Sequence, residues 1–166
     1  MDHFATMKGA EMHAKFWLIK SEPEVFSIDD LAKCKNQTTC WDGVRNYQAR
    51  NFIRDEMKIL DKVIFYHSNA EPPAAVGICE VVKEGYPDFT AFDPKDPHYD
   101  PKSKKEEPTW FMVDIKFVKK FSSEVSIEKI KADKKLQKIR LIQHGNRLSV
   151  MQLSKEEFDE IVKLGQ

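Results

Sequence analysis

The sequence "DKVIFYHSNAEPPAAVGICEVV", residues 61–82, predicts the centre of a β-sheet. Two apolar runs, "DKVIFYHS" and "AAVGICEVV", flank the turn-forming "NAEPP". Both runs are short and almost continuously apolar, which is typical of strands that are buried on both faces. We therefore expect two central strands joined by a turn.

Three further strands are expected, one before this pair in the sequence and two after it. They are "KFWLIK" at 15–20, "WFMVDIKFVKKF" at 110–121 and "NRLSVMQL" at 146–153. The second of these alternates cleanly and places four apolar residues on its core face: Phe111, Val113, Ile115 and Phe117. In the first, Trp17 and Ile19 face away from Phe16 and Leu18, and we interpret Trp17 as a core residue.

Short helices are expected between and after these strands. Ser27 and Asp30 form an acidic variant of the capping box, and Ser154 with Glu157 forms a second box before a helix that stops at Gly165. A third helix is expected in "SIEKIKAD" at 126–133. Strands mixed with short helices indicate the α+β class with a curved or barrel-like sheet.

Composition limits the classes of function. The 166 residues suit one domain. Equal numbers of basic and acidic residues, 27 each, argue against a protein that holds nucleic acid by bulk electrostatics. No apolar run approaches the roughly 20 residues of a membrane span, and we find no signal-peptide pattern. Cys34, Cys40 and Cys79 fit reduced thiols, so we expect a cytoplasmic protein, or a nuclear one in a eukaryote.

Two segments depart from the regular pattern. Residues 1–14 show no periodicity, and we expect a disordered extension there, ahead of a single domain at 15–166. Residues 84–109 are rich in Pro, Asp and Lys, and loops of that length are often functional lids or locally disordered. The lysines of this loop are interpreted as solvated surface, with contact to a phosphate backbone as the alternative: Lys102, Lys104 and Lys105.

The stretch "WDGVRNYQARNF", residues 41–52, gathers groups that can stack on a ring, hold an anion or bond a polar edge. A helix from about 45 to 57 would have an apolar stripe of Ala49, Phe52, Ile53 and Met57. Arg45 and Asn46 would lie at the start of that stripe and face inward, where polar groups need partners. From the residues alone, a structural role and a ligand site are equally favoured.

Several stretches together resemble one known family, the EVE domain of the thymocyte nuclear protein and its small bacterial relatives. They are "FWLIKSEPEVFSIDDL", "WDGVRNYQARNFIRDEMK", "VIFYHSN", "VGICEVV", "YPDFTAFDP", "YDPKS", "WFMVDIKFV" and "RLSVMQL". The resemblance covers about residues 16–162, and "WLIKSEP" with "WDGVRNYQARN" is its most specific part. One departure is Leu60 before Asp61, where the family pattern leads us to expect a Gly-Asp turn.

The resemblance implies a PUA-like fold, a small curved or closed mixed β-barrel of about five to six strands with short helices outside. It also implies a role, because EVE domains are associated with recognising modified bases, notably 5-methylcytosine and its oxidised forms in DNA. We therefore expect a non-catalytic nucleic-acid-binding module that stacks a modified base and reads its edge by hydrogen bonds in an aromatic and polar pocket.

The candidate base-binding residues carry distinct roles in this hypothesis. Trp41 is the first stacking platform and Tyr66 the second, in one cleft with Asn46. The other candidates are the edge readers Ser21, Ser68 and Asn69, the phosphate holders Lys20, Arg45 and Arg147, the wall or rim residue Trp110, and Ser149, which has a strand hydrogen bond as its structural alternative. His67 is interpreted as a satisfied core histidine.

Other classes of function are weighed against this hypothesis. None of the hydrolase, deaminase, P-loop or dinucleotide motifs occurs, and His67 and Ser68 are neighbours in a strand that point to opposite faces. We therefore expect no catalytic residue, metal or cofactor. The alternatives are an RNA-binding PUA-like module on modified RNA, and a small-molecule-binding or protein-interaction adaptor. We expect a monomer that binds modified DNA or RNA, binds no membrane, and acts beside restriction or RNA-modification enzymes.

Overall fold

The computed structural model describes residues 14–166; the extension expected at residues 1–14 lies outside this range, apart from Ala14. Six strands form one mixed sheet in the order β2-β5-β4-β3-β1-β6. The strands are β1 (Phe16–Ser21), β2 (Thr38–Cys40), β3 (Lys62–His67), β4 (Ala74–Pro87), β5 (Phe111–Ser126) and β6 (Val150–Leu153). The pair β1 and β3 is parallel, and every other neighbouring pair is antiparallel.

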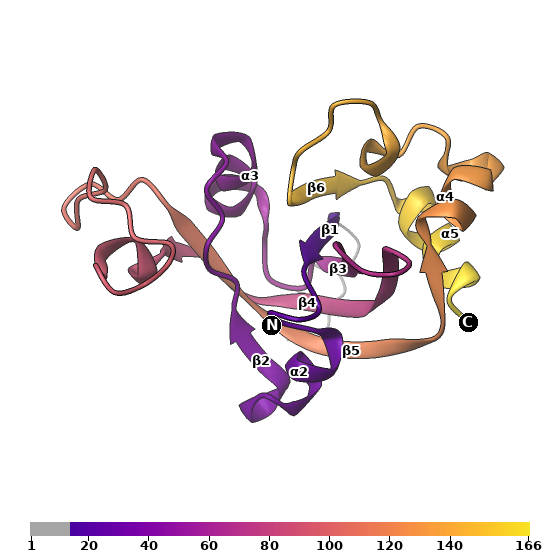
Figure 1. Cartoon of the computed structure of the whole chain (residues 1–166), viewed down its shortest axis with the longest axis horizontal. Helices are drawn as coiled ribbons and strands as arrows, with labels where there is room; N and C mark the ends of the chain where they lie inside the picture. Colours follow the sequence, from indigo (N-terminus) through magenta and orange to yellow (C-terminus); the bar gives the residue numbers. More distant parts are fainter. Residues whose placement is uncertain (1–13) are drawn as a thin grey trace, which may run out of the picture.

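The long strands β4 and β5 run through the molecule and carry most of its curvature (Figure 1). Their pairing shifts register at four places along β4. Such bulges bend a strand and increase its twist. Within residues 14–166, no pairing joins the edge strands β2 and β6, so the sheet is curved and not closed. The expected α+β fold is thus confirmed in its open, curved form.

The core forms where the expected central strands lie. Residues 63–66 of β3 are all buried, and so are Trp17, Leu18 and Ile19 of β1, which lies between β3 and β6. Consecutive side chains of a strand point to opposite faces, so this pattern means that both faces of β1 are covered. The prediction that Trp17 belongs to the core is confirmed, and its Nε1 donates a hydrogen bond to Asp61 Oδ2 at 2.8 Å.

Four helices cover the sheet. They are α2 (Ile28–Lys33), α3 (Tyr47–Asn51), α4 (Ile127–Ala132) and α5 (Lys155–Leu164). Both predicted capping boxes are present, at Ser27 and at Ser154, and α5 ends at Gly165 as expected. Helices α4 and α5 lie together at the end of β5, and α3 lies towards the opposite end of the molecule (Figure 1).

The helix expected at about 45–57 is present over residues 47–56, but it is α-helical only in its first part. Its α-helical part is α3 alone, and a π-helical turn, Phe52–Glu56, follows. Asn46 is the N-cap, with Oδ1 accepting from the Ala49 N–H at 3.0 Å, and it is exposed instead of facing inward. An asparagine whose side chain bonds the backbone in this way is an N-cap, and its own backbone is not helical.

Other boundaries also differ from the expected ones. Strand β2 and four 3₁₀ turns had no recognised signal; the turns are Lys35–Gln37, Phe89–Phe92, Lys134–Leu136 and Arg140–Ile142. The last strand begins only at Val150, and β4 extends to Pro87, into the segment expected to be loop. Antiparallel pairing with β5 lengthens β4, because a neighbouring strand supplies hydrogen bonds that a local sequence pattern does not reveal.

Candidate functional site

A pocket of about 460 Å³ opens at the carboxyl end of β1. Its walls come from β1, from the turn after β1, from β2 with the two residues that follow it, and from one residue of the loop between β4 and β5. The lining residues are Lys20, Ser21, Glu22, Val25, Phe26, Thr39, Cys40, Trp41, Asp42 and His98. The pocket thus joins three segments that are far apart in the sequence.

Trp41 forms the aromatic wall of this pocket. It is half-buried and packs against the core cluster. Its ring meets Phe26 at 6.1 Å between centroids with a 69° angle, and Phe65 at 5.6 Å with 76°. These edge-type contacts hold the indole, and within residues 14–166 Trp41 forms no parallel aromatic stack. Its backbone N–H donates to the Val113 carbonyl at 2.7 Å, so the position of Trp41 is set by β5 as well.

The polar groups of the pocket are partly desolvated. Burial lowers the pKa of Lys20. Burial also raises the pKa of Asp42, and the negative charge of Asp88 adds to this rise. The pKa of the Cys40 thiol is raised, first by burial and then by Asp42, so the thiol is protonated at neutral pH. The pocket therefore offers a partly desolvated donor, Lys20, and a partly desolvated acceptor, Asp42, beside the exposed carboxylate of Glu22.

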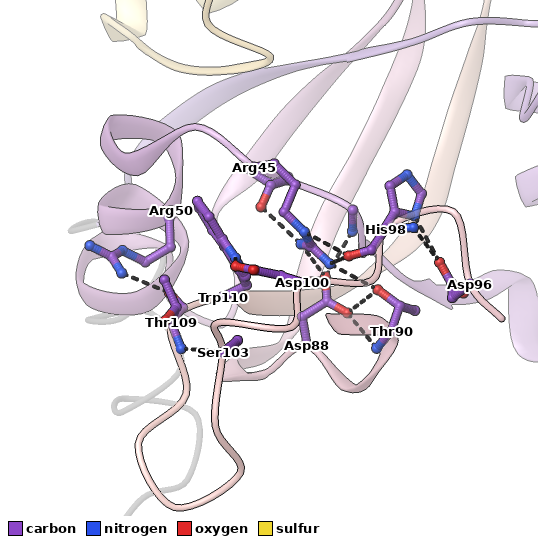
Figure 2. A network of polar contacts seen from close by, with 12 residues as sticks. Arg45, Arg50, Asp88, Thr90, Asp96, His98, Asp100, Ser103, Thr109 and Trp110 are labelled. Atoms are coloured by element: carbon purple, nitrogen blue, oxygen red, sulfur yellow. Dashed lines mark hydrogen bonds and ion pairs between the residues drawn. The ribbon is translucent and has the colours of Figure 1, made fainter. Parts of the chain in front are cut away.

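A buried ion pair holds the turn behind the pocket (Figure 2). The fully buried Asp88 accepts hydrogen bonds from the Gly43 N–H at 2.8 Å, from Arg45 Nη1 at 2.9 Å and from the Thr90 N–H at 2.9 Å. Arg45 also donates from Nε and Nη2 to the His98 carbonyl, at 3.1 and 2.7 Å. Arg45 therefore joins the turn after Asp42 to the loop that supplies His98, and its guanidinium is occupied by these bonds.

Two further features of this turn are the close packing at Gly43 and the lowered pKa of Asp88. Gly43 has a φ of +78°, and a Cβ there would lie 2.7 Å from the His98 ring, so only glycine fits. Burial opposes ionisation of Asp88, but the hydrogen bonds from Thr90, Gly43 and Arg45 outweigh it and lower the pKa of this carboxyl. Asp88 therefore stays ionised and keeps four donors in place, the fourth of which is the Thr90 hydroxyl.

Trp110 anchors the long loop from the other side (Figure 2). Its ring is buried, and its Nε1 donates to Asp100 Oδ2 at 2.7 Å. The Tyr47 ring lies 5.0 Å from it, and the Arg45 guanidinium lies 5.4 Å from its centroid. Trp110, expected as a pocket wall or rim residue, does not line the Trp41 pocket. It instead orders a loop for which a lid or local disorder was expected.

The sequence-predicted residues divide into three groups. Lys20, Ser21 and Trp41 line the pocket together. Ser68 and Asn69 brace its edge instead, because the Ser68 N–H donates to the Ser21 carbonyl at 2.9 Å and Asn69 Nδ2 donates to Glu22 Oε1 at 2.9 Å. The remaining predicted residues, Arg45, Asn46, Tyr66, Trp110, Arg147 and Ser149, lie outside the lining.

The expected shared cleft of Trp41, Asn46 and Tyr66 is not present. Phe65 contacts Trp41, so the next residue of β3, Tyr66, points to the opposite face of the sheet. Tyr66 is buried, and its pKa is raised to about 12 by burial and by the charge of Glu128. Asn46 caps α3 and lines a separate groove with Arg147. The Ser149 carbonyl accepts from the Lys20 N–H at 2.9 Å, which is a strand hydrogen bond.

The residues missed by sequence reasoning are Glu22, Val25, Phe26, Thr39, Cys40, Asp42 and His98. A signal for Asp42 was available, because it directly follows Trp41 in the most specific motif. No local signal points to His98, whose carbonyl accepts two hydrogen bonds from Arg45. His67, interpreted as a core histidine, is half-buried, and its Nε2 accepts from the Ile28 N–H at 3.1 Å.

No cluster of three or more His, Cys, Asp and Glu side chains in residues 14–166 is arranged to hold a metal ion. Within the same range, no helix has the length and apolar character needed to cross a membrane.

Known proteins resemble this chain along most of its length. Thymocyte nuclear protein 1 of Rattus norvegicus is 46% identical over 167 residues, covering 91% of this chain and 74% of the relative. A crystal structure of human THYN1 protein in complex with DNA that contains 5-methylcytosine has a TM-score of 0.87 at 43% identity, covering 92% of this chain and 98% of that one. A hypothetical protein from Leishmania major has a TM-score of 0.87 at 46% identity, with coverage of 93% and 96%.

The family model for the EVE domain matches residues 15–164, nearly all of the part that the structure describes. The sequence resemblance, the fold and the relatives agree with this match. The chain therefore belongs to the EVE domain family.

Proposed function

We propose that this chain is a non-catalytic module that binds DNA and recognises a modified base, such as 5-methylcytosine, in the Trp41 pocket. One observation carries the proposal. A half-exposed tryptophan shares a pocket with a donor and an acceptor, Lys20 and Asp42, in a chain with the fold of human THYN1, which was solved with DNA containing 5-methylcytosine. A base turned out of a duplex needs a stacking surface and partners for its edge.

The polar pair in the pocket suits the edge of a cytosine. The N4 amino group of cytosine is a donor, and carboxylates accept hydrogen bonds from it. Asp42 supplies that acceptor, and the Lys20 ammonium supplies a donor for the neighbouring acceptor atoms of the ring. Val25 and Phe26 provide apolar contacts of the kind that favour a pyrimidine methyl group. Stacking on Trp41 would add about 1–3 kcal/mol.

The two candidate nucleophiles in the lining, Cys40 and Ser21, are not activated by a neighbouring base. The Cys40 thiol has a raised pKa and is not an activated nucleophile. The Ser21 hydroxyl donates to the Phe26 carbonyl and not to a basic side chain. A nucleophile paired with a base is the arrangement that covalent catalysis requires. The bound base should therefore be recovered unchanged after long incubation, as judged by mass spectrometry of the oligonucleotide.

The test is a binding panel at fixed low salt with matched oligonucleotides. Duplex DNA with a single 5-methylcytosine, the same duplex with cytosine, and the matching single strands and RNAs are compared. We expect the methylated DNA to bind most tightly. A preference for RNA would favour the RNA-binding alternative, and equal affinity for all members would reject base recognition.

The pocket itself is tested with Asp42→Asn. This change removes the charge of the acceptor, so we expect the affinity for methylated DNA to fall by about tenfold, the scale of one charge-assisted hydrogen bond. Asp159→Asn is the matched control, because Asp159 lies on α5 and lines another cavity. Equal effects of the two substitutions would place base recognition elsewhere.

A further inference from the structure

The molecule has a second polar groove beside the Trp41 pocket. It lies between the start of α3 and the segment that precedes β6. The lining residues are Asn46, Gln48, Arg140, Gln143, His144, Gly145, Asn146, Arg147 and Leu148. This lining holds two guanidiniums, an imidazole and four side-chain amides, and no carboxylate.

The cations of this groove are not neutralised within the described residues. Arg140 and Arg147 are exposed, and neither forms an ion pair or a side-chain hydrogen bond with any residue in 14–166. Arg45, Arg50 and Arg54, by contrast, are all bonded to neighbours. Asn146 adds a further donor, because its Nδ2 is buried and has no hydrogen-bond acceptor among the described residues. A buried donor without a partner is costly unless a ligand supplies an acceptor.

The other polar cavities lack this combination. The cavity on α5 contains Glu156, Asp159 and Glu160 beside its lysines. The cavity under Arg50 and Arg54 includes Glu107, and both arginines are already engaged. Free cations, unpartnered amide hydrogen and no competing carboxylate together describe a site for an anion.

The groove is joined to the Trp41 pocket at two points. Asp42 lines the pocket and Asn46 lines the groove, so the two residues are four positions apart, at most about 14 Å of extended chain. Leu148 of the groove is followed by Ser149, whose carbonyl accepts from Lys20 of the pocket at 2.9 Å. Asp42 and Asn46 therefore lie within roughly four nucleotide steps of duplex DNA, at about 3.4 Å each.

We propose that the groove of Arg140, Asn146 and Arg147 binds a backbone phosphate of the same nucleic acid whose base enters the Trp41 pocket. This inference rests on the proposed function for the nucleic-acid ligand, and it assigns a different part of that ligand to a different site. A phosphate contact positions the strand and adds affinity without reading the base. Guanidinium groups suit this role, since their paired donors match two phosphate oxygens.

The experiment compares two double variants that change the net charge equally. Arg140→Gln with Arg147→Gln removes the two cations of the groove. Lys135→Gln with Lys163→Gln removes two cations from the acidic cavity on α5. Affinities for methylated and unmethylated duplexes are measured over a range of salt concentrations, and thermal denaturation confirms that each variant is folded.

The expected result separates the groove from the pocket. The arginine variant should lose at least about tenfold in affinity for both duplexes, the scale of one charge-assisted hydrogen bond. Its salt dependence should become shallower by about 0.9 in the slope of log K against log[salt], one phosphate contact. The ratio of affinities for methylated and unmethylated DNA should stay at the wild-type value.

Two results would overturn the proposal. One is an arginine variant with the same slope and affinity as the lysine control. The other is loss of the methylation preference together with the affinity, which would make the groove a base-reading site. If the wild type shows no methylation preference but the arginine variant still loses slope, base recognition fails while the phosphate site stands.

A nearly isosteric change tests the groove without removing an arginine. Asn146→Asp keeps the oxygen that accepts from the Leu148 N–H and replaces the unpartnered donor with a negative charge. Asn146→Asp should lower the affinity for both duplexes, and this change in affinity should be larger than the change that Asp159→Asn causes. Unchanged affinity in Asn146→Asp would contradict a phosphate at this position.

Discussion

At the residue scale, Trp41 combines a structural and a binding role. It is half-buried against Phe26 and Phe65 and also lines the pocket. We predict that Trp41→Ala remains folded but is destabilised by about 1–2 kcal/mol, roughly half the value for a fully buried large side chain. Its binding free energy for methylated DNA should become less favourable by about 1–3 kcal/mol, the contribution of one stacked base.

Calorimetric binding and urea denaturation separate these two effects of Trp41→Ala. Phe89→Ala is the matched control, because the Phe89 ring is 59% exposed and lines none of the cavities described above. Full affinity in folded Trp41→Ala would remove Trp41 from the binding surface.

A second residue-scale prediction concerns Leu60, which departs from the glycine expected on the family pattern. Leu60 has a φ of +78°, a left-handed conformation that costs an L-residue about 1–2 kcal/mol. It is half-buried and does not belong to the core cluster. Leu60→Gly should therefore raise the free energy of unfolding by about 0.5–1 kcal/mol, after the greater chain entropy of glycine is subtracted.

The matched variant Leu60→Ala shows whether the backbone is the cause. Alanine removes the same side chain but keeps the strained conformation, so it should give no stabilisation. If both substitutions give equal unfolding free energies in urea, the conformation of Leu60 carries no cost.

At the element scale, the loop between β4 and β5 acts as a support for the pocket. Asp88 at its start accepts from Gly43 and Arg45, and His98 farther along packs against Gly43. We predict that Asp88→Asn destabilises the fold by about 2–3 kcal/mol, because it leaves the partly buried Arg45 without its counter-ion. The same change should weaken binding, since the turn next to Asp42 loses its anchor.

The contribution of Asp88 has a defined pH dependence. The folded state lowers the pKa of this carboxyl below its ordinary value of 3.8. The stabilisation is therefore fully present above about pH 4–5 and is lost as the pH falls through the lowered folded-state pKa. Thermal denaturation should show a constant gap between the wild type and Asp88→Asn at neutral pH that narrows in acid.

The exposed pair of Arg54 and Asp55 provides the comparison for that experiment. Asp55→Asn should leave the melting temperature nearly unchanged at neutral pH, because surface ion pairs contribute little. A gap between the wild type and Asp88→Asn that stays constant through the acid range would contradict the ionised role of Asp88.

At the scale of the whole molecule, zero net charge limits the electrostatic part of binding. Arg45 is occupied by Asp88 and His98, which leaves Lys20, Arg140 and Arg147 as the cations near the two sites. We predict contacts to about two to four phosphates, and hence a slope of log K against log[salt] of about −2 to −4 on duplex DNA.

The slope is obtained from titrations of one methylated duplex at several salt concentrations. A slope near zero would indicate a free nucleobase or another uncharged ligand. A slope far steeper than −4 would indicate a broad basic surface, which the even charge composition does not suggest.

Local sequence patterns predict much of the fold. The apolar runs of β3 and β4, the alternation in β5 and the capping boxes at Ser27 and Ser154 all act between residues that are close in the sequence, so they were predictable. The start of α3 could not be predicted in the same way, because Asn46 could be either the first helical residue or the N-cap. Its hydrogen bond from the Ala49 N–H makes it the N-cap.

The amino-acid sequence is sufficient to identify the family, the α+β class and three residues of the candidate site, Lys20, Ser21 and Trp41. The positions of Arg45, Tyr66 and His98, by contrast, follow only from the tertiary structure. It turned Arg45 towards Asp88, placed Tyr66 on the far face of the sheet, and brought His98 to the pocket. The physical reason is that such contacts depend on strand register and loop packing between distant segments, and no local pattern encodes which distant group will satisfy a buried charge.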